Sequence, residues 1–158
     1  MPITDRVLIQ QEPFDTGAEI RQLIEADQAM GAVVNFVGVM RNMNEGETVS
    51  EMTLEHYPGM TEKALQVIIE EARERWHLGQ VTVIHRVGKL RPSDEIVLVA
   101  VSAEHRGEAF DGCEYIIDFL KTRAPFWKKE KTAHGVRWVD ERESDMAAVE
   151  QWNRQDHA

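Results

Sequence analysis

Two segments rich in valine and isoleucine, joined by a short connection, most constrain the fold of this chain. Residues 81–87 and 95–101 each have the composition of a buried strand, and the connection between them runs through residues 90–94, which include a proline. A connection of this length leaves no room for a crossover helix. We therefore expect the two strands to pair antiparallel.

The remaining segments add strands and helices in an interleaved order. Further strands are expected near residues 7–9, 32–39 and 48–57, the second of them buried or nearly so, and a hairpin with Gly135 in its turn is expected from residues 127–131 and 136–139. Helices are expected at residues 16–26, 62–76 and about 110–120, with an acidic helical tail over residues 140–152. Because hairpins alternate with helices, this order favours an α+β fold over a doubly wound parallel sheet. We expect residues 1–158 to form a single domain.

Local signals predict where the first two helices begin. Thr16 and Glu19 have the spacing of a capping box, in which the two side chains bond to backbone N–H groups of the first turn. Thr61 is expected to cap the second helix, with Met60 and Leu65 forming a hydrophobic staple.

The third helix is expected to bury one stripe of apolar side chains. Phe110, Cys113, Ile117 and Leu120 recur at three- and four-residue spacing and mark this stripe. Cys113 is therefore expected to be a small core residue and not a nucleophile. Lys121 borders the stripe one turn after Ile117, which predicts a half-buried lysine at the end of the helix.

A cluster of cations follows this helix in a chain that is otherwise acidic. Residues 121–131 hold five of the 18 lysine and arginine residues, whereas the chain has 28 aspartate and glutamate residues. Phe126 and Trp127 lie within the cluster, and aromatic side chains can hold neighbouring lysines in a partly dry setting. The pattern suggests an anion-binding site. The alternative is a basic surface hairpin whose lysine stems lie along apolar surface.

Composition argues against several classes of protein. A net charge of −10 and an isoelectric point near 5.1 argue against general nucleic-acid binding. No apolar run approaches the roughly 20 residues of a membrane helix, and the first residues do not read as a signal peptide, so we expect a cytoplasmic protein without a membrane partner. One cysteine excludes a disulfide framework and a cysteine-rich zinc site. No role is assigned to five histidines that lack metal-ligand spacing, namely His56, His77, His85, His134 and His157.

Five cationic residues follow predicted strands or flank a helix end. Arg41 follows one strand, His105 and Arg106 follow another, and Lys121 and Lys128 flank the end of the third helix. Together they could surround one pocket with a positive interior, which would suit a phosphorylated substrate, although a His-Arg pair after a strand is more often a surface turn. Arginine binds phosphate with two parallel hydrogen bonds, whereas a partly buried lysine can act as a nucleophile or proton carrier.

The sequence also resembles the large, catalytic subunit of molybdopterin synthase over nearly its whole length. The resemblance is carried by residues 54–60 (LEHYPGM), 83–88 (VIHRVG), 105–106 (HR) and above all 121–128 (KTRAPFWK). It implies an α/β-hammerhead-type fold with an additional β-hairpin subdomain. It also implies a homodimer at the centre of a heterotetramer, in which the partner is a small ubiquitin-like sulfur-carrier subunit with a C-terminal Gly-Gly thiocarboxylate.

The resemblance implies a reaction and a set of site residues. Sulfur would pass from the carrier thiocarboxylate to cyclic pyranopterin monophosphate, a phosphorylated pterin, to form the dithiolene of molybdopterin without a metal or other cofactor. Lys121 and Lys128 are implied as the catalytic lysines. The implied substrate-binding positions are Val39, Met40, Arg41, His105, Arg106, Lys121, Lys128, Lys129 and Arg142.

Two hypotheses follow, and two other classes of function stay open at this point. Cys113 is badly placed to carry a persulfide, so sulfur would have to arrive from a partner. A two-fold dimer would also allow a composite pocket, in which His105 and Arg106 of one subunit lie beside Lys121 of the other. The open alternatives are a non-catalytic anion- or partner-binding module and a purely structural oligomerisation domain.

Overall fold

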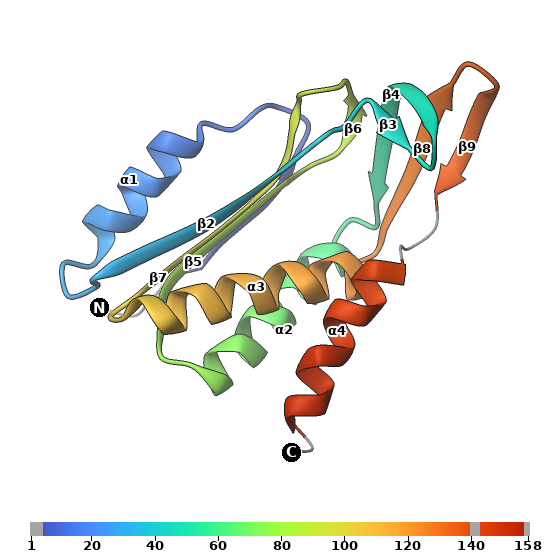
Figure 1. Ribbon diagram of the computed structural model, residues 1–158. Helices are drawn as coiled ribbons and strands as arrows, with labels where there is room; N and C mark the ends of the chain where they lie inside the picture. The colour runs from blue at the N-terminus through green and yellow to red at the C-terminus, as the bar shows by residue number, and fades with distance from the viewer. Residues whose placement is uncertain (1–4, 140–142, 157–158) are drawn as a thin grey trace.

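The computed structural model describes residues 5–139 and 143–156, and its strands form two sheets (Figure 1). The first sheet has four strands in the order β1 (Arg6–Gln10), β5 (Leu78–Arg86), β7 (Glu95–Ala103) and β2 (Ala32–Val39). β1 and β5 are parallel, and the other two pairings are antiparallel. The antiparallel pairing predicted for residues 81–87 and 95–101 is confirmed, because Val83 lies opposite Val99.

The second sheet joins segments from opposite halves of the chain. Its strands run in the order β3 (Met43–Asn44), β4 (Glu47–His56), β8 (Phe126–Thr132) and β9 (Gly135–Val139), and β6 (Gly88–Leu90) also pairs with β4. All of these pairings are antiparallel. The predicted hairpin is present, with residues 133–134 in its turn, and Gly135 pairs with Thr132 beside the turn at a φ angle of 117°, which glycine adopts without strain.

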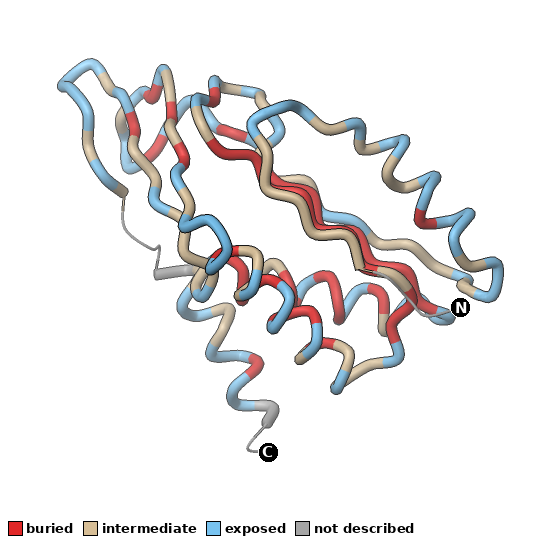
Figure 2. Tube along the Cα trace, turned by 180° about the vertical axis from the view of Figure 1, so that it is seen from behind, coloured by how far each residue is buried: buried red, intermediate tan, exposed pale blue. Residues whose placement is uncertain are grey.

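Helices cover both faces of the four-stranded sheet (Figure 1). α1 (Thr16–Ala26) packs on one face, α2 (Met60–Arg75) and α3 (Arg106–Arg123) pack on the other, and α4 (Glu143–Asp156) packs against α3. Successive side chains of β5 point to opposite faces of the sheet. Val81 and Val83 pack in the core beneath α2 and α3, whereas Ile84 packs with Leu23 of α1 on the other face. The buried positions follow the middle of the sheet and the helix faces turned toward it (Figure 2). The architecture is thus a mixed α and β fold.

An aromatic cluster holds α4 against the rest of the molecule. The ring of Trp152 is almost fully buried, and its centroid lies 5.5 Å from the ring centroids of both Trp76 and Tyr115, in edge-on arrangements. The acidic tail therefore forms the helix expected from its sequence and docks through one large side chain. None of the helices in residues 5–139 and 143–156 is long and apolar enough to cross a membrane.

The two predicted helix caps need correction. Asp15 caps α1, because its carboxylate accepts a hydrogen bond of 3.1 Å from the N–H group of Ala18. Thr16 instead donates to Glu95 on a neighbouring segment. The spacing of Thr16 and Glu19 does not reveal which residue caps the helix, because the cap is the residue at which the backbone becomes helical.

The start of α2 also differs from the prediction. Gly59 occupies the N-cap position, and the helix begins at Met60. The buried hydroxyl of Thr61 accepts from the N–H group of Tyr57 and donates to the carbonyl oxygen of Pro125, so it ties the helix to the segment before β8. Met60 is exposed and forms no buried staple.

Burial on α3 and β2 differs from the pattern read in the sequence. Phe110 is 60% exposed, whereas the buried side of α3 is broader and is formed by Ala109, Gly112, Cys113, Tyr115, Ile116, Phe119 and Leu120. The reason is that α3 packs against the sheet, α2 and α4 at once. β2 is an edge strand, so the expectation of a buried strand is wrong for Phe36 and Val39, which are exposed.

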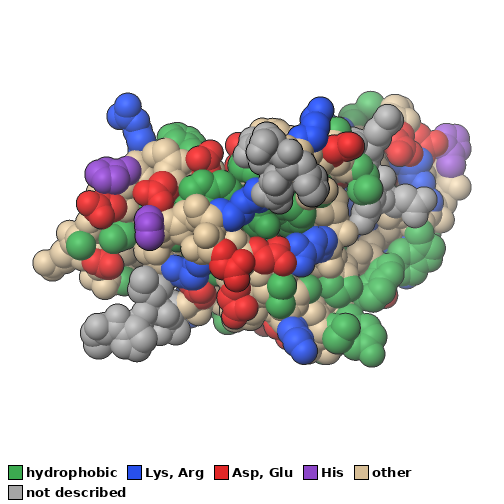
Figure 3. All heavy atoms as spheres, turned by 90° about the horizontal axis from the view of Figure 1, so that it is seen from below, with side chains coloured by type: hydrophobic (Ala, Val, Ile, Leu, Met, Phe, Trp, Pro, Cys, Tyr) green, Lys and Arg blue, Asp and Glu red, His purple; other side chains and the backbone are tan. Residues whose placement is uncertain are grey.

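Several large apolar side chains are exposed at the end of the molecule that carries the β8–β9 hairpin. Trp127, Val136 and Trp138 are each about half exposed or more, and hydrophobic side chains are visible at this end in the view from below (Figure 3). Clustered exposed apolar side chains are typical of surfaces that contact another molecule.

Candidate functional site

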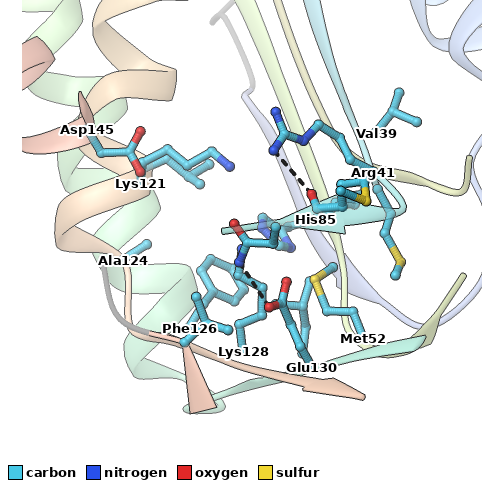
Figure 4. A pocket seen from close by; sticks show the side chains of 17 residues that line it. Val39, Arg41, Met52, His85, Lys121, Ala124, Phe126, Lys128, Glu130 and Asp145 are labelled. Atoms are coloured by element: carbon cyan, nitrogen blue, oxygen red, sulfur yellow. Dashed lines mark hydrogen bonds between the residues drawn. The ribbon is translucent and has the colours of Figure 1, made fainter. Parts of the chain in front are cut away.

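A cavity of about 280 Å³ lies where the end of α3 meets the second sheet. Its walls come from the end of β2, the strands β3, β4 and β8, the last turn of α3 and the beginning of α4 (Figure 4). Five of the residues predicted for the site line this cavity: Val39, Met40, Arg41, Lys121 and Lys128.

The two lysines reach the cavity from different elements. Lys121 lies in the last turn of α3, where the partial negative charge of the helix carbonyl groups favours a cation. It is exposed in this chain and not half-buried as predicted. Lys128 lies on β8 opposite Leu54 and Val139, which also line the cavity, and is half-buried.

Alternation along β8 decides which cations reach the cavity. Phe126, Lys128 and Glu130 share the cavity face of the strand, so Lys129 points to the opposite face. There the Nζ atom of Lys129 lies 4.8 Å from the ring centroid of Trp138. Lys129, which was expected in the pocket, therefore does not line it.

Arg41 follows β2 directly and is exposed at the mouth of the cavity. Its Nη2 atom donates a hydrogen bond of 3.1 Å to the carbonyl oxygen of Met43, a contact drawn in Figure 4. This bond uses one edge of the guanidinium group, which leaves other N–H groups to bind an anion in the cavity.

His105 and Arg106 lie far from the cavity of their own chain. His105 is the N-cap residue of α3 and Arg106 is its first residue, whereas Lys121 lies near the last. A rise of 1.5 Å per residue separates Arg106 from Lys121 by roughly 22 Å. One copy of the chain therefore does not bring Arg41, Lys121 and Lys128 together with His105 and Arg106. Arg142 lies outside the described residues.

The cavity also contains polar residues for which no role was predicted from the sequence. Glu130 is 4% exposed and accepts hydrogen bonds from Asn44 Nδ2, at 2.9 Å, and from Arg137 Nη2, at 3.3 Å. Asp145, at the beginning of α4, lies beside Lys121 in Figure 4. The period-two spacing of Lys128 and Glu130 was a signal that could have found Glu130.

His85 was assigned no role from the sequence, yet its ring lines the cavity. It lies on β5, and its ring stacks on Phe126 with centroids 3.9 Å apart. No group of three or more histidine, cysteine, aspartate or glutamate side chains in the described segments could hold a metal ion.

Comparison with known proteins identifies the family. A profile described as MoaE protein matches residues 9–123, which is more than half of the chain. The chain belongs to the MoaE protein family. The resemblance to catalytic subunits of molybdopterin synthase drawn from residues 54–60, 83–88 and 121–128 is confirmed.

Similar MoaE relatives cover nearly the whole chain. The molybdopterin synthase catalytic subunit of Ralstonia nicotianae is 58% identical over 146 residues, which are 92% of this chain and 83% of that protein. The corresponding subunit of Escherichia coli K12 is 55% identical over 147 residues, covering 93% and 97%. The solved structure of a molybdopterin biosynthesis MoaE protein from Burkholderia ambifaria has a TM-score of 0.82 and 49% identity, covering 95% of this chain and 99% of that one.

Cys113 of this MoaE chain is a core residue, as predicted. Its side chain is 4% exposed, and its Sγ atom lies 3.6 Å from the carbonyl oxygen of Val99. Burial is the main cause that raises the pKa of the Cys113 thiol to about 12, and the nearby charge of Glu114 raises it further. The thiol therefore stays protonated at neutral pH and lies inside the core, away from the cavity that contains Lys121.

Proposed function

We propose that this chain is the catalytic subunit of a molybdopterin synthase and transfers sulfur to cyclic pyranopterin monophosphate, producing the dithiolene of molybdopterin. The sulfur donor is the C-terminal thiocarboxylate of a small ubiquitin-like carrier subunit. Family membership supports the reaction class. The observation that carries the site assignment is that Lys121 and Lys128, the two ends of the segment KTRAPFWK, line one cavity although they belong to different elements.

The cations of the cavity suit the charges of this reaction. Arg41 binds the substrate phosphate at the cavity mouth, since its guanidinium group can donate two parallel hydrogen bonds. The thiocarboxylate sulfur forms a C–S bond with the pterin side chain while a C–O bond of the cyclic phosphate breaks, and water then releases the carrier as a carboxylate. Lys121 acts as nucleophile or proton carrier, and Lys128 stabilises the negative charge that develops on the departing phosphate oxygen. Val39 and Met40 form the apolar part of the wall.

A partner must bring the sulfur, because the one thiol of the chain is buried and protonated. The relatives are named catalytic subunits, a term that implies at least one other subunit in those enzymes. The exposed Trp127, Val136 and Trp138 supply apolar surface for such contacts. The assembly proposed is a homodimer at the centre of a heterotetramer, with one carrier subunit for each cavity.

The length of α3 supports a composite site in this dimer. His105 and Arg106 lie roughly 22 Å from Lys121 of the same chain, so they cannot contact a substrate held by that lysine. Both residues are exposed. In a two-fold dimer with antiparallel α3 helices, the first turn of one helix approaches the last turn of the other, and His105 and Arg106 complete the partner's phosphate site.

We also propose a fold type, a domain organisation and a cellular location for this chain. The fold is of the α/β-hammerhead type, with the β8–β9 hairpin as the additional subdomain, and residues 1–158 act as one domain in the cytoplasm. Packing between the two sheets supports a single domain, because Ile9 and Ile96 of the first sheet join the buried cluster of the second. In addition, His85 of β5 stacks on Phe126 of β8.

Reconstitution tests the function directly. The purified chain, mixed with thiocarboxylated carrier and cyclic pyranopterin monophosphate, should release dithiolene product, and the same mixture with carrier ending in an ordinary carboxylate should release none. A chelator should leave turnover unchanged, because the transfer uses no metal. Absence of product with both carriers, despite demonstrated binding of carrier to the chain, would refute the proposal.

A further inference from the structure

The orientation of the His85 ring is fixed by elements distant in sequence. The ring belongs to β5, is 6% exposed and stacks on Phe126 of β8, with ring planes 18° apart and centroids 3.9 Å apart. The His85 ring also lines the cavity that contains Lys121 and Lys128. Because the stack fixes the plane of the ring, the direction of each ring nitrogen is set by the fold.

The hydrogen bonds of His85 determine which nitrogen carries the proton. Nδ1 lies 2.8 Å from the carbonyl oxygen of Arg86. A carbonyl oxygen accepts and cannot donate, so Nδ1 carries the hydrogen atom and Nε2 of the neutral ring carries a lone pair. Within the described residues, the hydrogen bond of the His85 ring is the one made by Nδ1. Among the described residues, the fully buried side-chain atoms that lack a hydrogen-bond partner are Gln80 Oε1 and Arg137 Nε. Nε2 of His85 is not one of these atoms, although within the same residues it makes no such bond. It is therefore accessible from the cavity that the ring lines.

The ring is uncharged over the ordinary pH range. Burial lowers the pKa of His85 to about 3, the Arg86 carbonyl acts in the opposite direction, and the charges of Lys121 and His56 lower the pKa further. Arg41 and Lys128, which line the same cavity, add positive charge there, and Glu130 is the acidic residue on the adjoining strand β8. An imidazole with these neighbours neither stores a proton at neutral pH nor donates to a phosphate from Nε2.

We propose that Nε2 of His85 accepts a hydrogen bond from an N–H group of the pterin ring of the substrate. This inference rests on the proposed function, whose substrate carries both a phosphate and a flat heterocycle with N–H donors. A lone pair repels phosphate oxygens and attracts N–H groups, so His85 also sets the direction in which the substrate lies. The pterin ring enters toward His85 and Phe126, while the phosphate stays with Arg41 at the mouth.

The surroundings of His85 fit a flat ring. Phe126, Ile96, Met52 and Leu54 supply apolar surface at this side of the cavity. In Figure 4, His85 lies between Lys121 and Arg41 on one side and Phe126 and Met52 on the other. An acceptor among apolar side chains distinguishes a pterin from an apolar ring of the same size, because burying an N–H group without a partner is unfavourable.

Binding measurements with three variants test the proposal. His85→Phe keeps a ring that stacks on Phe126 but removes the acceptor, His85→Gln places an amide oxygen near the position of Nε2, and His134→Phe changes an exposed histidine in the hairpin turn. Calorimetric titration of the full chain with cyclic pyranopterin monophosphate should show about tenfold weaker binding for His85→Phe. Binding should stay within about threefold of wild type for His85→Gln and be unchanged for His134→Phe. The ratio of the His85→Phe and wild-type dissociation constants should be constant from about pH 5.5 to 8, because the acceptor is neutral throughout this range.

The outcomes separate this inference from the function on which it rests. Equal affinity of wild type and His85→Phe, or a ratio that follows a titration near pH 6.5, would overturn the role of His85 alone. Should His85→Phe not fold, ¹⁵N spectra of histidine-labelled wild type decide: saturation with the pterin should shift the Nε2 resonance while Nδ1 stays protonated, and an unmoved Nε2 resonance overturns the proposal. Wild-type protein that does not bind the pterin at all overturns both the inference and the proposed function.

Discussion

The indole Nε1 atom of Trp152 donates a hydrogen bond of 2.8 Å to the Oδ2 atom of Asp118, which joins α4 to the middle of α3. Burial of Asp118 raises the pKa of its carboxyl group, and the hydrogen bond from Trp152 acts in the opposite direction by stabilising the charged form. The same docking holds the beginning of α4, with Asp145, at the wall of the cavity. A contact one helical turn before Lys121 thus positions Asp145 beside that lysine.

Replacing Trp152 should release α4 without unfolding the sheets. Trp152→Ala removes a buried ring and its hydrogen bond, a loss of about 3–5 kcal/mol in a packed core. Hydrogen exchange should then accelerate over residues 143–156 and stay slow in β5 and β7. Met146→Ala, at an exposed position of the same helix, is the matched control. Trp152→Phe should lose about 1 kcal/mol at pH 7 and less at pH 3, because the indole N–H group bonds a protonated, neutral Asp118 more weakly than the carboxylate. Equal losses at both pH values would contradict this account.

Removing the amine of Lys121 should nearly abolish product formation. A nucleophile or proton carrier contributes about 10²- to 10⁴-fold to a rate, so Lys121→Ala should fall by at least about 100-fold while keeping its melting temperature. Lys121→Arg should be almost as inactive, because a guanidinium group stays protonated. The measurement is the rate of dithiolene formation in the reconstituted system. Near-wild-type turnover by the arginine variant would instead fit a binding patch that requires positive charge alone.

The thiol of Cys113 should be dispensable for sulfur transfer. Cys113→Ala should keep most of the activity with thiocarboxylated carrier, because the wild-type thiol is buried and its pKa is about 12. Native protein should also resist alkylation by iodoacetamide at pH 7, as read by mass spectrometry, and should react after unfolding. Detection of a Cys113 persulfide that disappears when substrate is added would reverse the assignment.

Mixing two inactive variants tests the composite site. Lys121→Ala and Arg106→Ala proteins are combined under conditions that exchange subunits. Random pairing makes about half of the dimers mixed, and each mixed dimer has one of its two sites intact, so activity should recover to roughly a quarter of wild type. Native mass spectrometry verifies the exchange. Activity that remains at the level of either parent after verified exchange would place the whole pocket within one subunit.

The helices and the longer strands were predictable because each has a local pattern, whereas the short strands β3 and β6 were not predicted. The pair formed by residues 81–87 and 95–101 follows from composition and a short connection, and the structure has it as β5 and β7. Local patterns did not predict burial correctly where a helix packs against several other elements at once. Phe110 matched the expected stripe but is exposed, because three packing partners rotate and widen the buried side of α3.

The candidate site was predictable only in part, for a related reason. Lys121 and Lys128 could be selected because a run of cations is visible in an acidic chain. His85 carries no such signal, since its place in the cavity depends on packing between β5 and β8. Glu130 is indicated only by its period-two spacing from Lys128, and its burial depends on the antiparallel pairing of β4 with β8. Such pairings across distant segments are not encoded in any short stretch of sequence.

The burial of Cys113 protects the one thiol of this chain from cellular oxidants. A sulfurtransferase that carries sulfur on its own cysteine must keep that cysteine accessible, and it is then open to oxidation and to mixed disulfides with glutathione. This chain has one cysteine, enclosed by β7 and α3. The one thiol of this chain is therefore shielded from oxidation and from mixed disulfides, so the cations proposed for catalysis do not depend on the redox state of a cysteine.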